Sequence, residues 1–257
     1  MSVLFAEDIV DKLNFTISID SEMNKIEVPP NEVLFFDSYF HYNFSNLFIL
    51  RFSSPQEFFV RFLEVENENI KHVALIHILG MRAQLLSHFP LHSSAVILNS
   101  KVNLFSGKSG SGKSTLASEL AKRGLDFGGD EMCVLKLLND GLFMRPYFKA
   151  AHIGKSLIQK EWISLTNKSY VENLPIHRVF FVEKAEEYSV VKLSSRQVIP
   201  SLLFNHFKPY LVNDIEGKKK RFEFALELVR RVDFYKLLWP HNNNEESYKR
   251  LIEFLND

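Results

Sequence analysis

The sequence has a single cysteine among its 257 residues, so it cannot form an intramolecular disulfide. It also lacks any run of about eighteen apolar residues, which excludes an ordinary transmembrane helix. The sequence also has no excess of either sign of charge, because 31 basic side chains balance 31 acidic ones. Its net charge would therefore not attract nucleic acid or an anionic membrane. The first residues lack the basic flank and apolar segment of a signal peptide. We expect a cytoplasmic protein, with no membrane or nucleic-acid partner, that meets charged partners only locally.

Hydrophobic residues are plentiful, at 46% of the sequence, with 24 phenylalanines against 10 glycines. A chain of this length and composition can bury a sizeable core, and it allows one large domain or one domain with a small appendage. We interpret the phenylalanine content as core filling or background codon bias, and Trp162, Trp239 and Cys133 as core residues. The chain changes character near residue 90. This predicts a β-rich N-terminal region with a connecting helix at 1–90 and a second domain at 91–257.

The first ninety residues contain short stretches in which apolar and polar residues alternate, the pattern of half-buried strands. Pro29 and Pro30 mark a turn among them. Apolar residues then recur at helical spacing from residue 69 to residue 89, across Gly80, and predict a helix packed on a core. The expected strands cover residues 15–19, 25–28, 33–36 and 47–52.

The most informative segment is glycine-rich and fits the pattern G-x-x-x-x-G-K-[ST] over residues 107–114. A strand is predicted before it, at 102–106, and a helix after it, at 115–123. Glycines let consecutive backbone N–H groups turn toward one point, and the helix presents its positive end to the same point. The loop can therefore wrap the phosphates of a nucleoside triphosphate. The alternative is a glycine-rich turn that matches the pattern by chance.

This pattern gives the residues of the segment specific roles, with ATP and Mg²⁺ as the expected ligands. Lys113 would bridge the β- and γ-phosphates, and Ser114 would hold Mg²⁺. The expected ATP-binding residues are Gly107, Lys108, Ser109, Gly110, Ser111, Gly112, Lys113, Ser114 and Thr115.

The elements around the loop indicate an α/β domain. A strand at 93–98 and a short turn at 99–101 form a hairpin with the strand that enters the loop. Gly124 ends the helix that follows, and residues 127–135 are expected to form one strand with an acidic pair near its start. Further strands are predicted at 178–182 and 232–238, and helices at 195–206, 219–231 and 245–255.

The stretch from residue 91 to residue 135 resembles the HPr kinase/phosphorylase family and its related kinases. His92 precedes the hairpin, the loop has the form G-x-S-G-x-G-K-S, Arg123-Gly124 follows the loop helix, and the pair Asp130-Glu131 comes next. The resemblance implies a P-loop kinase domain of the HPr kinase type with a mixed sheet, preceded here by the small β-rich region. Glu131 stands where the family usually has Asp, and a downstream glycine-rich signature is absent. A related kinase with an acceptor other than HPr is therefore implied.

The resemblance also implies roles for the acids and the histidine. Asp130 matches the family's catalytic aspartate, which takes the proton from the acceptor hydroxyl. Glu131 would help Ser114 to hold Mg²⁺, and His92 would hydrogen-bond an acid or the region of the γ-phosphate. Together with Lys113, the expected catalytic residues are Asp130 and His92. The simpler alternatives are a solvated strand start for the acids and a core or turn position for the histidine.

Phosphoryl transfer also benefits from a further cation on the γ-phosphate oxygens. The sequence offers Arg145, Lys149, Arg230 and Arg231 and does not choose among them; Arg145 is preferred because it follows the acidic strand closely. An ordinary surface position is the alternative for each. The basic run at 218–221 could meet an acidic peptide or nucleic acid, but such a run more often begins a solvated helix.

Two functions stay open at this point. The first is an ATP-dependent kinase that transfers the γ-phosphate to a hydroxyl, most simply a serine, of a peptide, small protein or small molecule. The second is a non-catalytic ATP-sensing protein that docks a partner through its N-terminal region. A transport ATPase is disfavoured, because the sequence has no L-S-G-G-Q signature. Enzymes of the resembling family form oligomers, so the resemblance leaves a homo-oligomer open.

Overall fold

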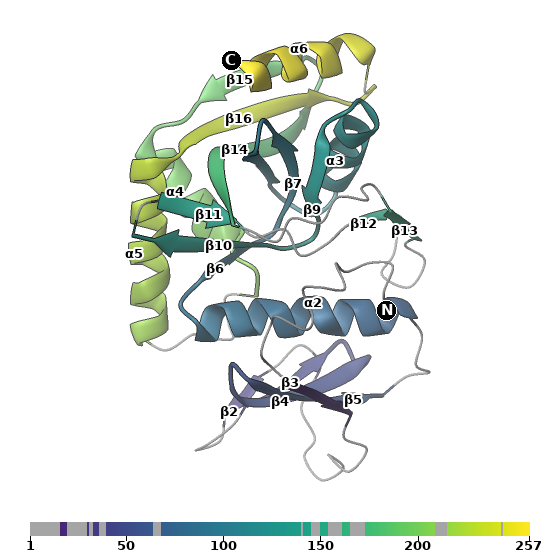
Figure 1. The fold of residues 1–257 in the computed structure, drawn as a ribbon, viewed down its shortest axis with the longest axis vertical. Coiled ribbons are helices and arrows are strands. Elements are labelled where there is room, and N and C mark those ends of the chain that lie inside the picture. The colour runs from purple at the N-terminus through teal and green to yellow at the C-terminus, as the bar shows by residue number, and fades with distance from the viewer. Residues whose placement is uncertain are drawn as a thin grey trace.

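Figure 1 presents the computed structural model of the chain, which describes residues 16–19, 30, 33–35, 40–63, 68–139, 141–144, 150–153, 161–164, 173–208, 215–242 and 244–257. The strand expected at 25–28 lies outside these residues, as do Arg145, Lys149 and the side chain of Trp162. No helix within the described ranges is long and apolar enough to cross a membrane.

The N-terminal region forms a five-stranded sheet with a long helix packed on it. Its elements are β1 (Thr16–Ile19), β2 (Val33–Phe35), β3 (Phe40–Phe44), β4 (Phe48–Ser54), β5 (Glu57–Phe62) and α2 (Glu68–Leu85). The strand order is β1-β5-β4-β3-β2, and all neighbours are antiparallel except β1 and β5. Aromatic side chains of the sheet share one core with apolar residues of the helix, among them Tyr42, Phe48, Phe58, Val73 and Ile78.

Strands β1, β2 and β4 and helix α2 agree with the sequence-based expectation, whereas β3 and β5 were not expected. The turn between β3 and β4 contains no glycine, although Ser45 and Asn46 both adopt positive φ, at 47° and 59°. The side chain of Asn43 accepts a hydrogen bond from the backbone N–H of Asn46 at 3.0 Å and helps to hold this turn. Asparagine tolerates the left-handed region, so the chain reverses here without the glycine signal that would have divided the segment.

The rest of the chain builds a larger mixed sheet. Its strands are β6 (Phe89–Leu91), β7 (Ser93–Leu98), β8 (Lys101–Ser106), β9 (Asp126–Gly129), β10 (Cys133–Leu138), β11 (Gly141–Met144), β14 (Leu174–Ala185), β15 (Ser189–Lys192) and β16 (Asp233–Pro240). In the middle, β8, β14 and β16 run parallel to one another. Antiparallel strands continue the sheet on both sides, and β11 pairs with only the first residues of β14, so the sheet curls. A separate pair, β12 (Ala150–Ile153) and β13 (Glu161–Ser164), lies outside it.

Helices cover both faces of this sheet (Figure 1). α3 (Lys113–Lys122) and α6 (Glu245–Asn256) pack on one face, and α4 (Ser195–Phe204) and α5 (Ile215–Arg231) on the other. The parallel strands are therefore buried on both sides, which explains the unbroken apolar run at 179–182, directly after Arg178. Trp239 and Cys133 are core residues, as predicted, at 1% and 3% exposed. Burial raises the pKa of the Cys133 thiol to about 12.

The single strand expected at 127–135 is wrong, because the chain bends in the middle of it. β9 ends at Gly129 and pairs with β7, whereas β10 begins at Cys133 and pairs with β6 and β11. Glu131, between them, has a φ of 63°, and the backbone N–H of Met132 bonds to the carbonyl of Asp130 at 2.8 Å. A non-glycine residue in the left-handed region is uncommon. The acidic pair therefore occupies a corner between two strands, not the start of one.

Helix α2 lies between the two sheets (Figure 1). One side packs on the N-terminal sheet, and at Gly80 the other side meets Phe207 and Met132, which belong to the part of the chain that builds the larger sheet. A Cβ on Gly80 would lie 2.6 Å from Cδ1 of Phe207 and 3.2 Å from the Met132 sulfur. His77, one turn earlier, stacks on Tyr42 and meets the Phe207 ring edge-on, with centroids 5.4 Å apart. β6 already belongs to the larger sheet, and the domain boundary expected after residue 90 stays a prediction.

Because of the close contact at Gly80, we expect a glycine-to-alanine substitution there to change the stability of the fold in the direction opposite to the usual one. In an exposed helix, glycine to alanine stabilises by about 1 kcal/mol. Here the added methyl group has no room, so we expect Gly80→Ala to lower the free energy of unfolding by about 1–3 kcal/mol. Urea denaturation followed by circular dichroism measures it. Phe207→Leu removes the ring from the contact, and Gly80→Ala in that background should cost at least about 1 kcal/mol less. A neutral or stabilising Gly80→Ala would contradict this packing.

Candidate functional site

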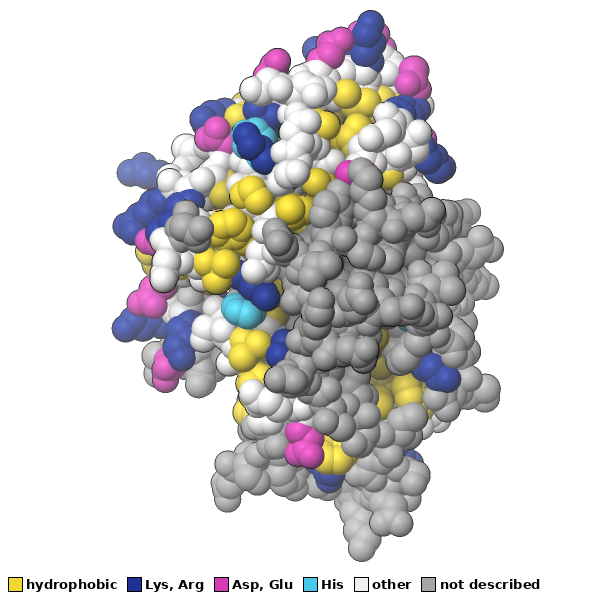
Figure 2. Space-filling model, in the orientation of Figure 1, with side chains coloured by type: hydrophobic (Ala, Val, Ile, Leu, Met, Phe, Trp, Pro, Cys, Tyr) yellow, Lys and Arg dark blue, Asp and Glu magenta, His cyan; other side chains and the backbone are white. Residues whose placement is uncertain are grey.

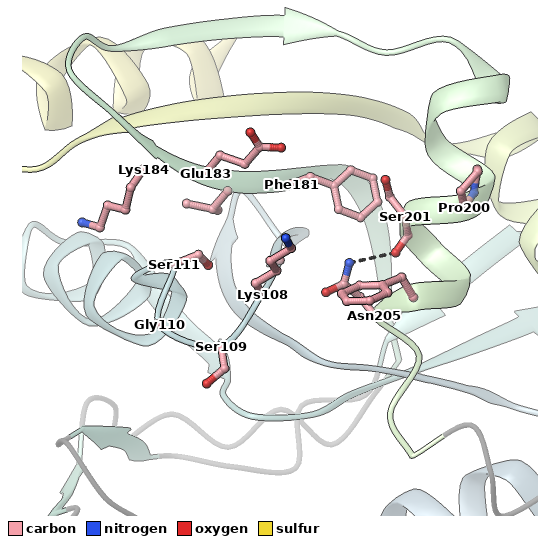
Figure 3. Close-up of a pocket in the computed structure, with 13 residues that line it drawn as sticks. Lys108, Ser109, Gly110, Ser111, Phe181, Glu183, Lys184, Pro200, Ser201 and Asn205 are labelled. Atoms are coloured by element: carbon pink, nitrogen blue, oxygen red, sulfur yellow. Dashed lines mark hydrogen bonds between the residues drawn. The ribbon is translucent and has the colours of Figure 1, made fainter.

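A cavity of about 690 Å³ opens where the glycine-rich loop meets the end of β14 and helix α4. Its volume is within the range of pockets that enclose small-molecule ligands. Figure 3 shows the arrangement, with the loop on one side and β14 and α4 on the other. The cavity is lined by Gly107, Lys108, Ser109, Gly110, Ser111, Phe181, Val182, Glu183, Lys184, Pro200, Ser201, Phe204 and Asn205.

The glycine-rich loop, residues 107–112, connects β8 to α3, in the strand–loop–helix order that the sequence predicts. Its three glycines have φ values of 142°, 80° and 95°, a region that other residues rarely adopt. Gly107 is also required by space, because a Cβ would lie 2.7 Å from the carbonyl oxygen of Val182. Lys113 is 6% exposed, and its ammonium donates to the carbonyls of Gly107 at 2.9 Å and Lys108 at 3.0 Å. The ammonium is thus held against the first residues of the loop.

The start of α3, beside this ammonium, has no side-chain cap. Gly112 occupies the cap position and has no side chain to accept from the first turn, which contains no acidic residue. The hydroxyl of Ser111 is buried and has no hydrogen-bond partner within the described part of the chain. N–H groups at a helix start, a buried hydroxyl and an ammonium make a donor set that suits phosphate oxygens. The loop therefore fits the anionic ligand that its sequence predicts.

The acidic corner lies next to the start of the loop. β7 carries Ser93 opposite Ser106 and Ala95 opposite Gly129, so this hairpin strand joins the loop strand to the corner. Asp130 is 2% exposed, and its Oδ1 accepts a hydrogen bond from the Ser94 hydroxyl at 2.5 Å. Neither Asp130 nor Glu131 lines the cavity. The corner therefore adjoins the cavity without forming part of its wall.

His92 connects the corner, the loop strand and α4. Its Nδ1 lies 2.8 Å from the carbonyl oxygen of Glu131 and 3.9 Å from the Glu131 carboxylate. The contact to a carbonyl requires the proton on Nδ1. The His92 backbone N–H donates to the carbonyl of Asn205 at 2.8 Å, and the Ser106 hydroxyl donates to the His92 carbonyl at 2.9 Å. His92 is thus fixed in place, and Asn205 carries the connection on to the cavity wall.

The metal ligands predicted from the sequence are Ser114 and Glu131. Within the ranges that the structure describes, no three His, Cys, Asp or Glu side chains lie close enough together to hold a metal ion. Mg²⁺ usually needs only one or two protein ligands, because waters and substrate phosphates supply the rest. A half-buried Ser114 and a half-buried Glu131 are compatible with that mode, and they do not make an all-protein site.

The far wall of the cavity was not anticipated from the sequence. It consists of the end of β14 and the last turns of α4, where Phe204 is 69% exposed. The sequence contained a signal for the contribution of β14 to this wall, since a buried parallel strand beside the loop strand brings its carboxyl end to the same edge of the sheet. It contained no signal for the contribution of α4, because only the tertiary packing brings that helix over the loop.

The remaining sequence candidates lie away from the cavity. Arg230 and Arg231, at the end of α5, bond to Glu227 at 2.7 and 3.1 Å. In the basic run, Lys219 and Lys220 are exposed and reach acids one turn away at 3.8 and 2.7 Å. Figure 2 shows basic and acidic side chains interspersed along the edge of the molecule that α5 forms in Figure 1. The basic run is therefore the solvated start of a helix, as favoured from the sequence.

The fold and the loop define an α/β protein with a mixed sheet and a glycine-rich loop between a central strand and a helix. No protein-family model matches the sequence, and no curated protein is similar to it. Among solved structures, the chain is similar to the HPr(Ser) kinase/phosphatase from Coxiella burnetii, at 13% identity over 65% of this chain and 88% of that one, with a TM-score of 0.40. This likeness is distant and concerns the fold alone.

Proposed function

We propose that the protein binds ATP with Mg²⁺ at the glycine-rich loop and transfers the γ-phosphate to a hydroxyl of a peptide, small protein or small molecule. The observation that carries the proposal is the Lys113 ammonium. It is buried at the start of α3, 2.9–3.0 Å from two carbonyls of the loop, with an uncapped helix start and the unpaired Ser111 hydroxyl around it and the acidic corner beside the loop strand. Positive groups for the triphosphate and a carboxylate near the point of transfer are the main requirements of this chemistry.

Each residue of the site would have a separate role in binding or in phosphate transfer. The N–H groups of the loop and the Lys113 ammonium bind the β- and γ-phosphates, while Ser114 and Glu131 hold Mg²⁺, which offsets phosphate charge. The acceptor oxygen bonds to the γ-phosphorus as the bond to the β-phosphate oxygen breaks, so that ADP leaves. Asp130 takes the proton of the acceptor hydroxyl, and Ser94, bonded to Oδ1, holds that carboxylate in position. His92 holds the backbone of Glu131.

A second function is favoured by one observation, the burial of Asp130 at 2% exposure outside the cavity wall. A base must come within hydrogen-bond reach of its proton, directly or through one water, although this contact often tightens only in the complex. If the corner does not open, the loop still binds ATP and the protein senses the nucleotide without transferring phosphate.

Two measurements together separate these functions. Calorimetry with ATP and Mg²⁺ is expected to give a dissociation constant between about 1 µM and 1 mM. Incubation with γ-labelled ATP, Mg²⁺ and a lysate of the source cells should then label a product, which mass spectrometry identifies. Binding with no labelled product supports the sensing function instead. No uptake of ATP in the presence of Mg²⁺ would overturn both.

A further inference from the structure

Lys184 reaches the glycine-rich loop from the end of β14. β14 runs parallel to β8 with Phe181 opposite Ser106, so the residues that follow Phe181 continue beside the loop. The Cε and Nζ atoms of Lys184 both lie 3.4 Å from the point that a Cβ on Gly112 would occupy. Gly112 caps α3. The ammonium of Lys184, an exposed residue, therefore lies over the first turn of this helix, on the wall of the cavity.

This is an unfavourable place for a cation unless an anion shares it. The N-terminal end of a helix carries a partial positive charge, and the buried Lys113 adds a full one. The adjacent acid, Glu183, gives little compensation because its carboxylate pairs with Lys236 at 2.7 Å. Figure 3 shows Lys184 extending toward α3 while Glu183 points the other way. Among the described residues, Lys184 itself forms no ion pair.

The loop beneath Lys184 contains an independent sign of a ligand. The Ser111 side chain is 8% exposed, and its hydroxyl has no hydrogen-bond partner within the described ranges. A buried hydroxyl without a partner is destabilising, and Ser111 lines the same cavity as Lys184. Both the unpaired hydroxyl and the unpaired ammonium would be satisfied by the oxygens of one anion between them.

We propose that Lys184 is a phosphate-binding residue, whose ammonium contacts oxygens of the nucleotide's phosphate chain and offsets the charge that moves onto ADP during transfer. The inference rests on the proposed function and supplies the second cation that phosphoryl transfer benefits from. Arg230 and Arg231 are less suited to this role, because both are bound to Glu227 and neither lines the cavity.

The test uses the full chain and compares three ligands by calorimetry in the presence of Mg²⁺: ATP, inorganic tripolyphosphate and adenosine. Lys184→Ala is expected to weaken the binding of ATP and of tripolyphosphate by the same factor, about 10- to 100-fold. This factor corresponds to the loss of one hydrogen bond to a charged group. Binding of adenosine should not change between the wild type and the variant. Lys184→Arg, which keeps the charge, should recover most of the lost affinity.

Lys101→Ala is the matched control. This lysine is exposed at the other end of the loop strand, about 17 Å away along the strand, and its loss should leave both phosphate ligands within about twofold. Circular dichroism and the thermal midpoint establish that each variant is folded. Wild-type affinity in a folded Lys184→Ala variant would overturn the inference while leaving the proposed function intact. A wild type that binds neither ATP nor tripolyphosphate would instead overturn the proposed function.

Discussion

Lys113→Ala is expected to weaken the binding of ATP with Mg²⁺ by about 100-fold or more. The change removes a buried ammonium that can form charge-assisted hydrogen bonds to two phosphates, each worth about 1.5–3 kcal/mol. Isothermal titration calorimetry measures the effect. Labelled transfer should fall in parallel, because an enzyme that does not hold the triphosphate cannot position it.

This variant needs a stability control, since Lys113 also bonds the carbonyls of Gly107 and Lys108. Lys122→Ala removes the same charge from the other end of the same helix, where the ammonium pairs with Glu119 at 2.7 Å on the surface. It should bind ATP like the wild type. If Lys113→Ala is folded by circular dichroism and still binds ATP with wild-type affinity, the glycine-rich loop is not a triphosphate site.

Asp130→Asn is expected to slow phosphate transfer by about 100- to 10,000-fold, the usual range for loss of a general base. Affinity for ATP should change by less than about threefold, because Asp130 does not line the cavity. The amide has the shape of the carboxylate and can still accept the Ser94 hydrogen bond, so the fold should be retained. Single-turnover transfer to the labelled product, measured beside calorimetry, separates the two effects.

Ser94→Ala is the matched comparison, because it removes the hydroxyl that donates to Oδ1 and leaves the carboxylate. We expect it to slow transfer less than Asp130→Asn does, by about 100-fold at most, the effect of losing one hydrogen bond to a charged group. Full transfer by Asp130→Asn would remove this residue from the mechanism. If Glu131→Gln then abolished transfer without weakening the binding of ATP with Mg²⁺, the base would be the more exposed acid of the corner, beside His92.

The sequence predicts the local structure around the loop well. The hairpin of β7 and β8, the loop and α3 all occur where the pattern indicates, because the glycines, the preceding apolar strand and the following helix are local signals. Helices α4, α5 and α6 follow for the same reason, with ends within a few residues of expectation. The roles of the site residues and the ligands ATP and Mg²⁺ stay predictions until binding is measured.

The bend at the acidic corner was not predicted, although the sequence contains a local sign of it. Residues 127–135 end in an apolar stretch typical of a strand, but the Gly128-Gly129-Asp130 run before it consists of residues that favour turns. The positive φ of Glu131 is imposed by the packing of β9 on β7 and of β10 on β6. Long-range pairing can override a local preference for extended structure, and a single sequence does not record such pairing.

The sequence by itself determined the helices, the hairpin of β7 and β8 and the position of the glycine-rich loop, because helix and strand periodicity and the spacing of glycines, lysine and serine act over a few residues. Only the tertiary structure decided that Lys184 and α4 form the far wall of the cavity, that Asp130 is buried against Ser94, and that Gly80 lets α2 contact Phe207. These contacts join residues far apart in the chain. They depend on the order of strands in the sheet and on the side chains that fill the space between its layers, which no local pattern fixes.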